Sequence, residues 1–150
     1  MKLSSWRYLT IVTIAIMSFA MWTGCGKSTP PTFPVVGKVV YSDGKPFAGG
    51  YIELCPLGGE YRATARGEIQ QDGSFELSTF SKNDGAIEGD HAVLVIPPIP
   101  ERQSGQPLPR DVEQSIDPRF GQFGTSGLRI TVASDPTKNE VVLRVGRPGK

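Results

Sequence analysis

Apolar and polar residues alternate through most of the chain after residue 34, in short runs that end at turns rich in glycine or proline. Alternation with a period of two places one set of side chains on a single face of a strand. We therefore expect an all-β domain, with no helix of substantial length after residue 24. The expected strands are the runs 35–41, 51–55, 61–70, 75–80, 90–96, 128–132 and 141–145.

An Asp72-Gly73 dipeptide separates two of these runs, 66–70 and 75–80. Asp-Gly is typical of a type I′ turn, because both central residues of that turn need a positive φ. We expect the two runs to pair as an antiparallel hairpin. The residues expected to face the core are Val39, Ile52, Phe75, Val93 and Val132.

Residues 97–126 show no sustained period and are rich in proline, glutamine, glycine and charged side chains. A stretch of this length without structure is unusual in a compact domain, so we interpret it as a long insert. Its apolar residues Ile116, Phe120 and Phe123 are spaced at four and three positions. We expect them to dock onto the edge of their own sheet. The alternative is that they are exposed and contact a partner.

The N-terminal stretch has the three parts of a secretory signal peptide. Lys2 and Arg7 precede an apolar run over about 9–22, and small residues follow it. This run is shorter than the ~20 residues that a transmembrane helix needs. We expect residues 1–24 to be a cleaved export signal rather than a permanent anchor.

The segment Met21-Trp22-Thr23-Gly24-Cys25 resembles the lipobox of bacterial lipoproteins, although Trp22 stands where that family usually has leucine. The resemblance implies that Cys25 is acylated and becomes the new N-terminus; the alternative is an ordinary signal peptide with an incidental cysteine. Residues 25–34 would then be the lipidated cysteine and a proline-rich tether. Gly26 is not the aspartate that retains lipoproteins on the inner membrane of well-studied bacteria, which favours the outer membrane.

Charge and composition narrow the classes of partner. Removing residues 1–24 takes away Lys2 and Arg7 and changes the formal net charge from +1 to −1. A near-neutral chain without a basic cluster argues against a nucleic-acid partner. It also lacks a polybasic membrane patch, so membrane attachment has to come from lipid on Cys25.

The chain has two cysteines and one histidine. If Cys25 is acylated, Cys55 has no intramolecular partner, and we expect a small buried or half-buried thiol there. We expect His91 to be a partly exposed strand residue. One histidine and one free cysteine do not assemble the usual zinc ligand sets, so we expect no metal and no cofactor.

Several turn motifs resemble those of carboxypeptidase regulatory-like domains. They are Val36-Gly37-Lys38-Val39, Asp43-Gly44-Lys45-Pro46, Asp72-Gly73-Ser74-Phe75 and Gly89-Asp90-His91-Ala92-Val93, with His91 in place of the usual tyrosine. The end of the chain is similar to small lipoproteins of this type from planctomycete-like bacteria. The resemblance covers residues 35–146, including the insert at about 97–126. It implies a seven-strand antiparallel β-sandwich of transthyretin-like (prealbumin-like) type.

No catalytic set is apparent in the sequence. A G-x-S-x-G elbow and a phosphate-binding loop are absent. In carboxypeptidases the sandwich is an accessory to a separate catalytic domain, so the family name does not imply peptidase activity here. The transthyretin-like fold also hosts a hydroxyisourate hydrolase, but that enzyme uses several histidines, and this chain has one.

The resulting expectation is a non-enzymatic lipoprotein on the periplasmic side of the envelope, acting in interaction or surface structure. Its partners would be membrane lipid, through Cys25, and an envelope protein or glycan. The alternative is a carbohydrate- or peptide-binding module. The loop aromatics that could then contact a ligand are Tyr61, Phe120 and Phe123.

Overall fold

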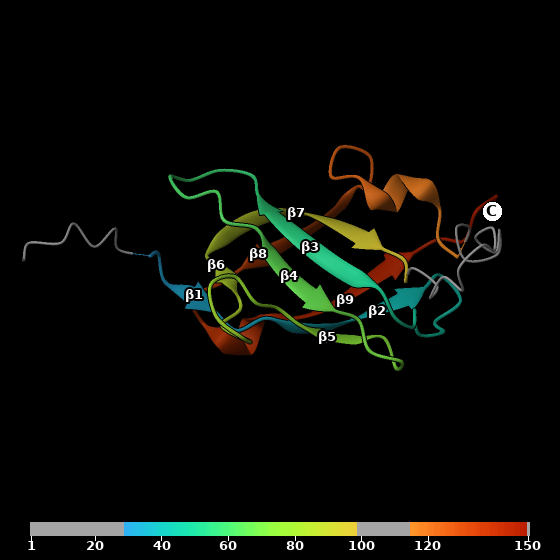
Figure 1. The fold of residues 1–150 in the computed structure, drawn as a ribbon, viewed down its shortest axis with the longest axis horizontal. Coiled ribbons are helices and arrows are strands. Elements are labelled where there is room, and N and C mark those ends of the chain that lie inside the picture. The colour runs from blue at the N-terminus through green and yellow to red at the C-terminus, as the bar shows by residue number, and fades with distance from the viewer. Residues whose placement is uncertain (1–28, 99–114, 150) are drawn as a thin grey trace, which may run out of the picture.

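The structure of the protein is a computed structural model that describes residues 29–98 and 115–149 (Figure 1). Within these ranges the chain forms nine strands and two short 3₁₀ helices. The expected export signal 1–24 and Cys25 lie outside the described residues, as does most of the expected insert 97–126.

Seven of the nine strands form two sheets. The three-stranded sheet has the order β5 (Ser74–Glu76), β2 (Val36–Tyr41), β9 (Glu140–Val145). The four-stranded sheet has the order β4 (Ala65–Glu68), β3 (Tyr51–Pro56), β7 (Gly89–Ile96), β8 (Leu128–Val132). A separate pair is formed by β1 (Thr32–Phe33) and β6 (Ala86–Ile87).

Strand β2 is the central strand of its sheet, because it pairs antiparallel with β5 on one side and parallel with β9 on the other. It thereby joins the beginning of the described chain to its last strand. Buried Asn139, just before β9, reinforces this link. Its side-chain amide donates to the carbonyl oxygens of Pro34 (3.2 Å) and Ala133 (2.8 Å), and its oxygen accepts from the Ala133 N–H (2.9 Å). One buried amide thus fixes the turn between β8 and β9 against the entry to β2.

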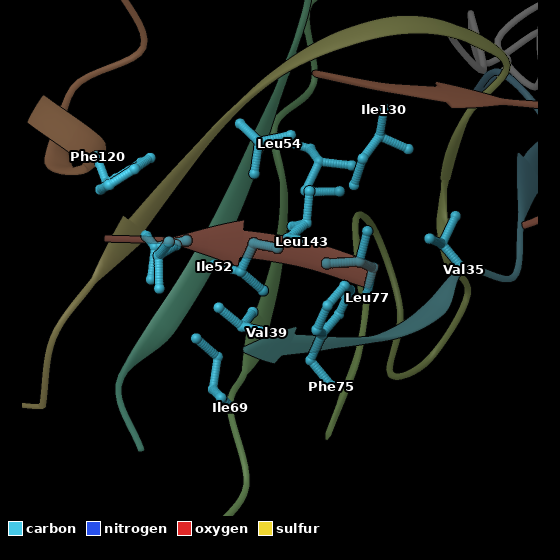
Figure 2. Packing of buried hydrophobic residues seen from close by; sticks show 14 of the residues in the cluster. Val35, Val39, Ile52, Leu54, Ile69, Phe75, Leu77, Phe120, Ile130 and Leu143 are labelled. Atoms are coloured by element: carbon cyan, nitrogen blue, oxygen red, sulfur yellow. The ribbon is translucent and has the colours of Figure 1, made fainter. Parts of the chain in front are cut away.

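The core lies between the two sheets, where their inward-facing side chains meet (Figure 2). Val39, Phe75 and Leu143 come from the three-stranded sheet, and Ile52 and Val93 come from the four-stranded sheet. All five residues expected from the alternation to face the core are buried: Val39, Ile52, Phe75, Val93 and Val132. The prediction of an all-β domain built from packed sheets is therefore confirmed.

The expected hairpin differs from the observed structure. Strand β4 pairs with β3 and β5 pairs with β2, so the two runs belong to different sheets and meet at a single bridge, Arg66 to Ser78. Inward-facing side chains on both runs explain this, because a chain that crosses from one sheet to the other buries both sets against one core.

The turn between β4 and β5 does lie at the expected residues, but its type differs. Gly73 has φ +80°, whereas Asp72 is not among the residues with positive φ. The Gly73 N–H donates to the Gln70 carbonyl (2.9 Å), and the Gln70 N–H donates to the Ser74 carbonyl (2.8 Å). This is the pattern of a turn followed by a left-handed glycine rather than a type I′ turn. A side chain at Gly73 would also meet the Val39 carbonyl oxygen, 2.5 Å from an ideal Cβ.

The second part of the expected insert packs onto the sandwich. Ile116 and Phe120 belong to the core cluster, and the 3₁₀ helix η2 (Pro118–Gly121) carries Phe120. The Asp117 N–H donates to the Gly146 carbonyl (2.9 Å), and the Tyr41 hydroxyl donates to the Ser115 carbonyl (3.0 Å). Docking onto the domain is confirmed for these two apolar residues.

Folded structure begins earlier than the expected boundary at residue 35. Thr32 and Phe33 pair with Ile87 and Ala86, and Phe33 packs against the core. Two residues of the expected tether, Thr32 and Phe33, thus belong to a strand, and the chain enters the fold beside β6.

Candidate functional site

An open groove of about 910 Å³ runs over the outward faces of β2, β5 and β9 and reaches β3 and β4. We call it the outer groove. Its lining residues are Val36, Gly37, Lys38, Tyr51, Arg66, Gly67, Glu68, Gln70, Ser74, Phe75, Glu76, Ser78, Lys82, Asn83, Glu140, Val141 and Val142.

Two exposed valines lie in this groove. Val36 is 45% exposed and Val142 is 62% exposed. In the β2–β9 register Val36 is opposite Glu140 and Lys38 is opposite Val142, so the valines are diagonal neighbours on one outward face. Exposed valines placed side by side on a strongly polar sheet face can pack against a partner's apolar side chains.

The part of the groove formed by β3 and β4 is aromatic and charged. Tyr51 is exposed, and the Arg66 guanidinium carbon lies 5.8 Å from the centre of its ring. Arg66 also donates from Nε to the Glu53 carboxylate at 2.7 Å, and its Nη2 contacts the same oxygen. Because Arg66 is mostly exposed, this pair adds little stability, but it orients the guanidinium beside the ring.

A loop that follows β5 forms another wall. The Asp84 carboxylate accepts hydrogen bonds from the backbone N–H groups of Thr79 (2.6 Å), Phe80 (2.9 Å) and Ser81 (2.9 Å). Burial raises the pKa of Asp84, but these donors outweigh burial, and the net pKa is below its usual value. The loop so held carries Asn83, whose amide donates to Glu76 in the groove.

Charges in the outer groove balance. Three lining residues are basic (Lys38, Arg66 and Lys82) and three are acidic (Glu68, Glu76 and Glu140). Such a lining is suited to a ligand of mixed charge with some apolar surface, and not to a polyanion. The groove was not expected from the sequence, although the doublets Val35-Val36 and Val141-Val142 indicate it. In a strand of period two, one valine of each doublet has to face outward.

A second pocket, of about 480 Å³, lies between the β3–β4 loop and the junction of β6 and β7. We call it the tip pocket; its lining residues are Pro56, Leu57, Gly58, Gly59, Glu60, Tyr61, Ile87, Glu88, Gly89 and Asp90. The Leu57 N–H donates to the Asp90 carbonyl (2.9 Å), which ties the loop to β7. The Asp90 carboxylate accepts from the Thr131 hydroxyl (2.6 Å).

The three aromatics expected to contact a ligand lie in different settings. Tyr61 is in the tip pocket and is 36% exposed. Phe120 is 4% exposed and packs in the core, with the Arg119 guanidinium carbon 4.6 Å from its ring centre. Phe123 is half-buried after η2. Phe120 is thus occupied by its own domain in this structure, while ligand contact by Tyr61 and Phe123 stays a prediction.

His91 is buried, which corrects the expectation of a partly exposed residue. It is 1% exposed and faces inward between Pro56 and Ile130 of the neighbouring strands. Nδ1 lies 3.0 Å from the Gly89 carbonyl oxygen, and Nε2 has no hydrogen-bond partner among the described residues. Burial lowers its pKa, against smaller opposing effects of the Gly89 carbonyl and Asp90. His91 lines neither pocket, so it is not placed to act on a ligand in either of them.

Cys55 is half-buried on the outward face of β3, as expected, and it has no disulfide partner among the residues that the structure describes. No three or more His, Cys, Asp or Glu side chains gather into a metal-binding group in residues 29–98 and 115–149. Over the same part of the chain, no helix has the length and apolar character that crossing a membrane requires.

No protein-family model matches this chain, and comparison with curated proteins and with solved structures gives no match either.

Proposed function

We propose that this chain is a lipid-anchored protein of the bacterial cell envelope whose β-sandwich is a non-enzymatic interaction module. In this proposal acyl chains on Cys25 hold the protein on the periplasmic side of a membrane, with the outer membrane favoured. The lipobox-like segment before Cys25 supports the anchor. The outer groove supports the interaction role.

The finer fold assignment is part of the same proposal. We assign the domain to the transthyretin-like class, as a carboxypeptidase regulatory-like domain. The turn motifs around Asp43-Gly44 and Asp72-Gly73 support this assignment, as does the division of seven strands into sheets of three and four. The assignment concerns architecture and carries no peptidase activity.

The observation that carries the interaction role is the pair of exposed valines in a groove of balanced charge. A small molecule usually binds in an enclosed, mostly apolar pocket. An extended segment of a partner protein instead uses a long open surface, with apolar contacts at the centre and polar groups around them. Val36 and Val142, flanked by Glu76, Glu140 and Lys38, fit the second description.

A glycan ligand is the second candidate, and the exposed Tyr51 ring in the same groove favours it. Sugar rings stack on exposed aromatic side chains, and the neighbouring Arg66 and Glu68 can hydrogen-bond to hydroxyl groups. Tyr51 is the only exposed ring among the lining residues, because Phe75 is buried in the core, and for this reason the protein partner is the leading proposal.

Site-specific photo-crosslinking of the full-length protein in native membranes tests the interaction role. A photoreactive amino acid replaces Val142 in the groove or, as a matched control, Arg129, which is exposed on the outward face of β8 outside the groove. We expect a protein adduct of defined mass from position 142 that is absent from position 129. The charge introduced by Val36→Asp should remove that adduct.

Equal adducts at both positions, or an adduct that survives Val36→Asp, would contradict a partner in the groove. Binding to purified cell-wall glycan that is lost in Tyr51→Ala, without a protein adduct, would instead establish the second candidate.

A further inference from the structure

The chain enters the fold at one identifiable end of the sandwich. Thr32 of β1 is opposite Ile87 of β6 in their antiparallel register. Cys25 precedes Thr32 by seven positions, and seven fully extended residues span at most about 25 Å. If Cys25 carries acyl chains, the end formed by β1 and β6 therefore has to stay within about that distance of the membrane surface.

The same end carries exposed apolar side chains. Ile87, the partner of Thr32, lines the tip pocket together with the β3–β4 loop. In this loop Leu57 is 50% exposed and Tyr61 is 36% exposed. Figure 1 shows the loop between β3 and β4 extending at the end of the domain where β1 and β6 lie, away from the C-terminus.

We infer that this end of the sandwich rests on the lipid surface, with Leu57 and Tyr61 making a second membrane contact beside the acylated Cys25. The inference rests on the lipid anchor proposed above. A bilayer is the expected occupant because the short chain between Cys25 and β1 brings this end of the sandwich next to the lipid.

The chemistry of the loop suits the region between headgroups and acyl chains. Tyrosine is enriched at that interface because its ring is apolar and its hydroxyl is polar. Leucine gains free energy when its side chain leaves water. A single short loop binds a membrane weakly, but a tether of a few residues makes its contact intramolecular and raises its effective concentration.

Charges around the tip pocket predict the type of lipid surface. The ionisable lining residues with a formal charge are Glu60, Glu88 and Asp90, all acidic. These carboxylates repel an anionic surface at short range. We therefore expect closer contact with zwitterionic phosphatidylcholine vesicles than with vesicles containing anionic phosphatidylglycerol.

A tryptophan reporter tests the inference on the full-length lipoprotein, purified from membranes and reconstituted into vesicles. Both tryptophans of the chain, Trp6 and Trp22, lie in the segment expected to be cleaved, so Leu57→Trp would give the mature protein a single reporter. Val142→Trp is the matched control, because it also replaces an exposed aliphatic residue but lies in the outer groove.

For Leu57→Trp we expect a blue-shifted emission and quenching by lipids brominated on their acyl chains, and for Val142→Trp neither effect. Tyr61→Ser combined with Leu57→Trp should reduce the quenching. Vesicle flotation separates the two proposals. Protein that floats with vesicles while Leu57→Trp is quenched no more than Val142→Trp overturns the second contact alone. Protein that lacks acylation and stays behind overturns the anchor, and the second contact with it.

Discussion

His91 Nδ1 lies 3.0 Å from the carbonyl oxygen of Gly89, two positions earlier on the same strand, while the other ring nitrogen is buried and has no hydrogen-bond partner in residues 29–98 and 115–149. The hydrogen bond to a carbonyl requires a proton on Nδ1. A neutral ring satisfies that bond, whereas a charged ring would have a second N–H in the core with no acceptor. The fold therefore favours the neutral form of His91.

This preference predicts a loss of stability in mild acid. Burial lowers the pKa of His91 in the folded state, so the unfolded state binds more protons below the ordinary pKa of about 6.5. The free energy of unfolding should be constant above that pH. It should fall as the pH drops below 6.5, by up to about 1.4 kcal/mol per pH unit.

Urea melts between pH 5 and pH 7.5 measure the effect, on residues 25–150 with Cys25→Ser and without a histidine tag. His91 is the single histidine of the chain, so the His91→Gln variant should show a flat profile over this range. A profile that is equally steep in both proteins would assign the pH dependence to other groups.

The turn at Gly73 should tolerate a side chain less well than a matched turn does. Gly73 and Gly44 have nearly the same φ, +80° and +84°, but an ideal Cβ at Gly73 lies 2.5 Å from the Val39 carbonyl oxygen, whereas Gly44 faces open space. Gly44→Ala should cost about 1–2 kcal/mol, from the left-handed conformation alone. Gly73→Ala should cost at least about 1 kcal/mol more, because the backbone of the turn or of β2 also has to move. Equal midpoints in denaturant melts would contradict the close contact.

Phe120 should contribute to stability as a core residue. Replacing it by alanine removes a buried ring that lies on a short 3₁₀ helix, and such truncations cost about 3–5 kcal/mol. Phe123→Ala, in the same segment but half-buried, should cost clearly less. Thermal melts of the two variants decide the matter: similar small losses would mean that residues 115–127 are not part of the cooperative unit.

Acylation of Cys25 has a direct chemical readout. Intact-mass measurement of membrane-extracted protein should give a chain that begins at Cys25 and carries lipid. The Cys25→Ser variant should lack this mass and leave the membrane fraction or stall as the precursor. Each acyl chain contributes about 0.8 kcal/mol per buried CH₂, so two or more chains give a stable anchor. Unmodified Cys25 in mature wild-type protein would refute the anchor.

Local alternation of apolar and polar residues was enough to predict the all-β fold class and the residues of the core. Val39, Ile52, Phe75, Val93 and Val132 were assigned to the interior from a period of two, and each is buried. This worked because burial of one face of a strand is a local property of the sequence.

Pairing partners were harder to predict, because they depend on residues far apart in the chain. The turn at Asp72-Gly73 was predicted correctly, but its flanking runs belong to different sheets. Their pairing depends on where β2 and β3 lie and not on the turn itself. The outer groove was missed for the same reason. Val36 and Val142 become neighbours only through the β2–β9 register.

His91 was placed wrongly because a polar residue in an alternating strand is normally expected to face water. Counting along β7 from Val93 and Val95 puts His91 on the same inward face. The alternation alone therefore places the His91 side chain on the buried face, whereas the polarity of imidazole favoured the exposed one. In this strand the period outweighed the polarity of the residue.

The parallel pairing of β2 with β9 has a consequence for the order of events during synthesis. At the start of this pair the Asn139 side-chain amide donates a hydrogen bond to the Pro34 carbonyl, and the two residues are 105 positions apart in the sequence. Strand β2 therefore emerges from the ribosome long before its parallel neighbour exists, and one side of it stays unpaired until Val145 has been added. Contacts of such long range form late and slowly. The three-stranded sheet therefore cannot be completed until nearly the whole chain has been made, a property compatible with the export that we propose above.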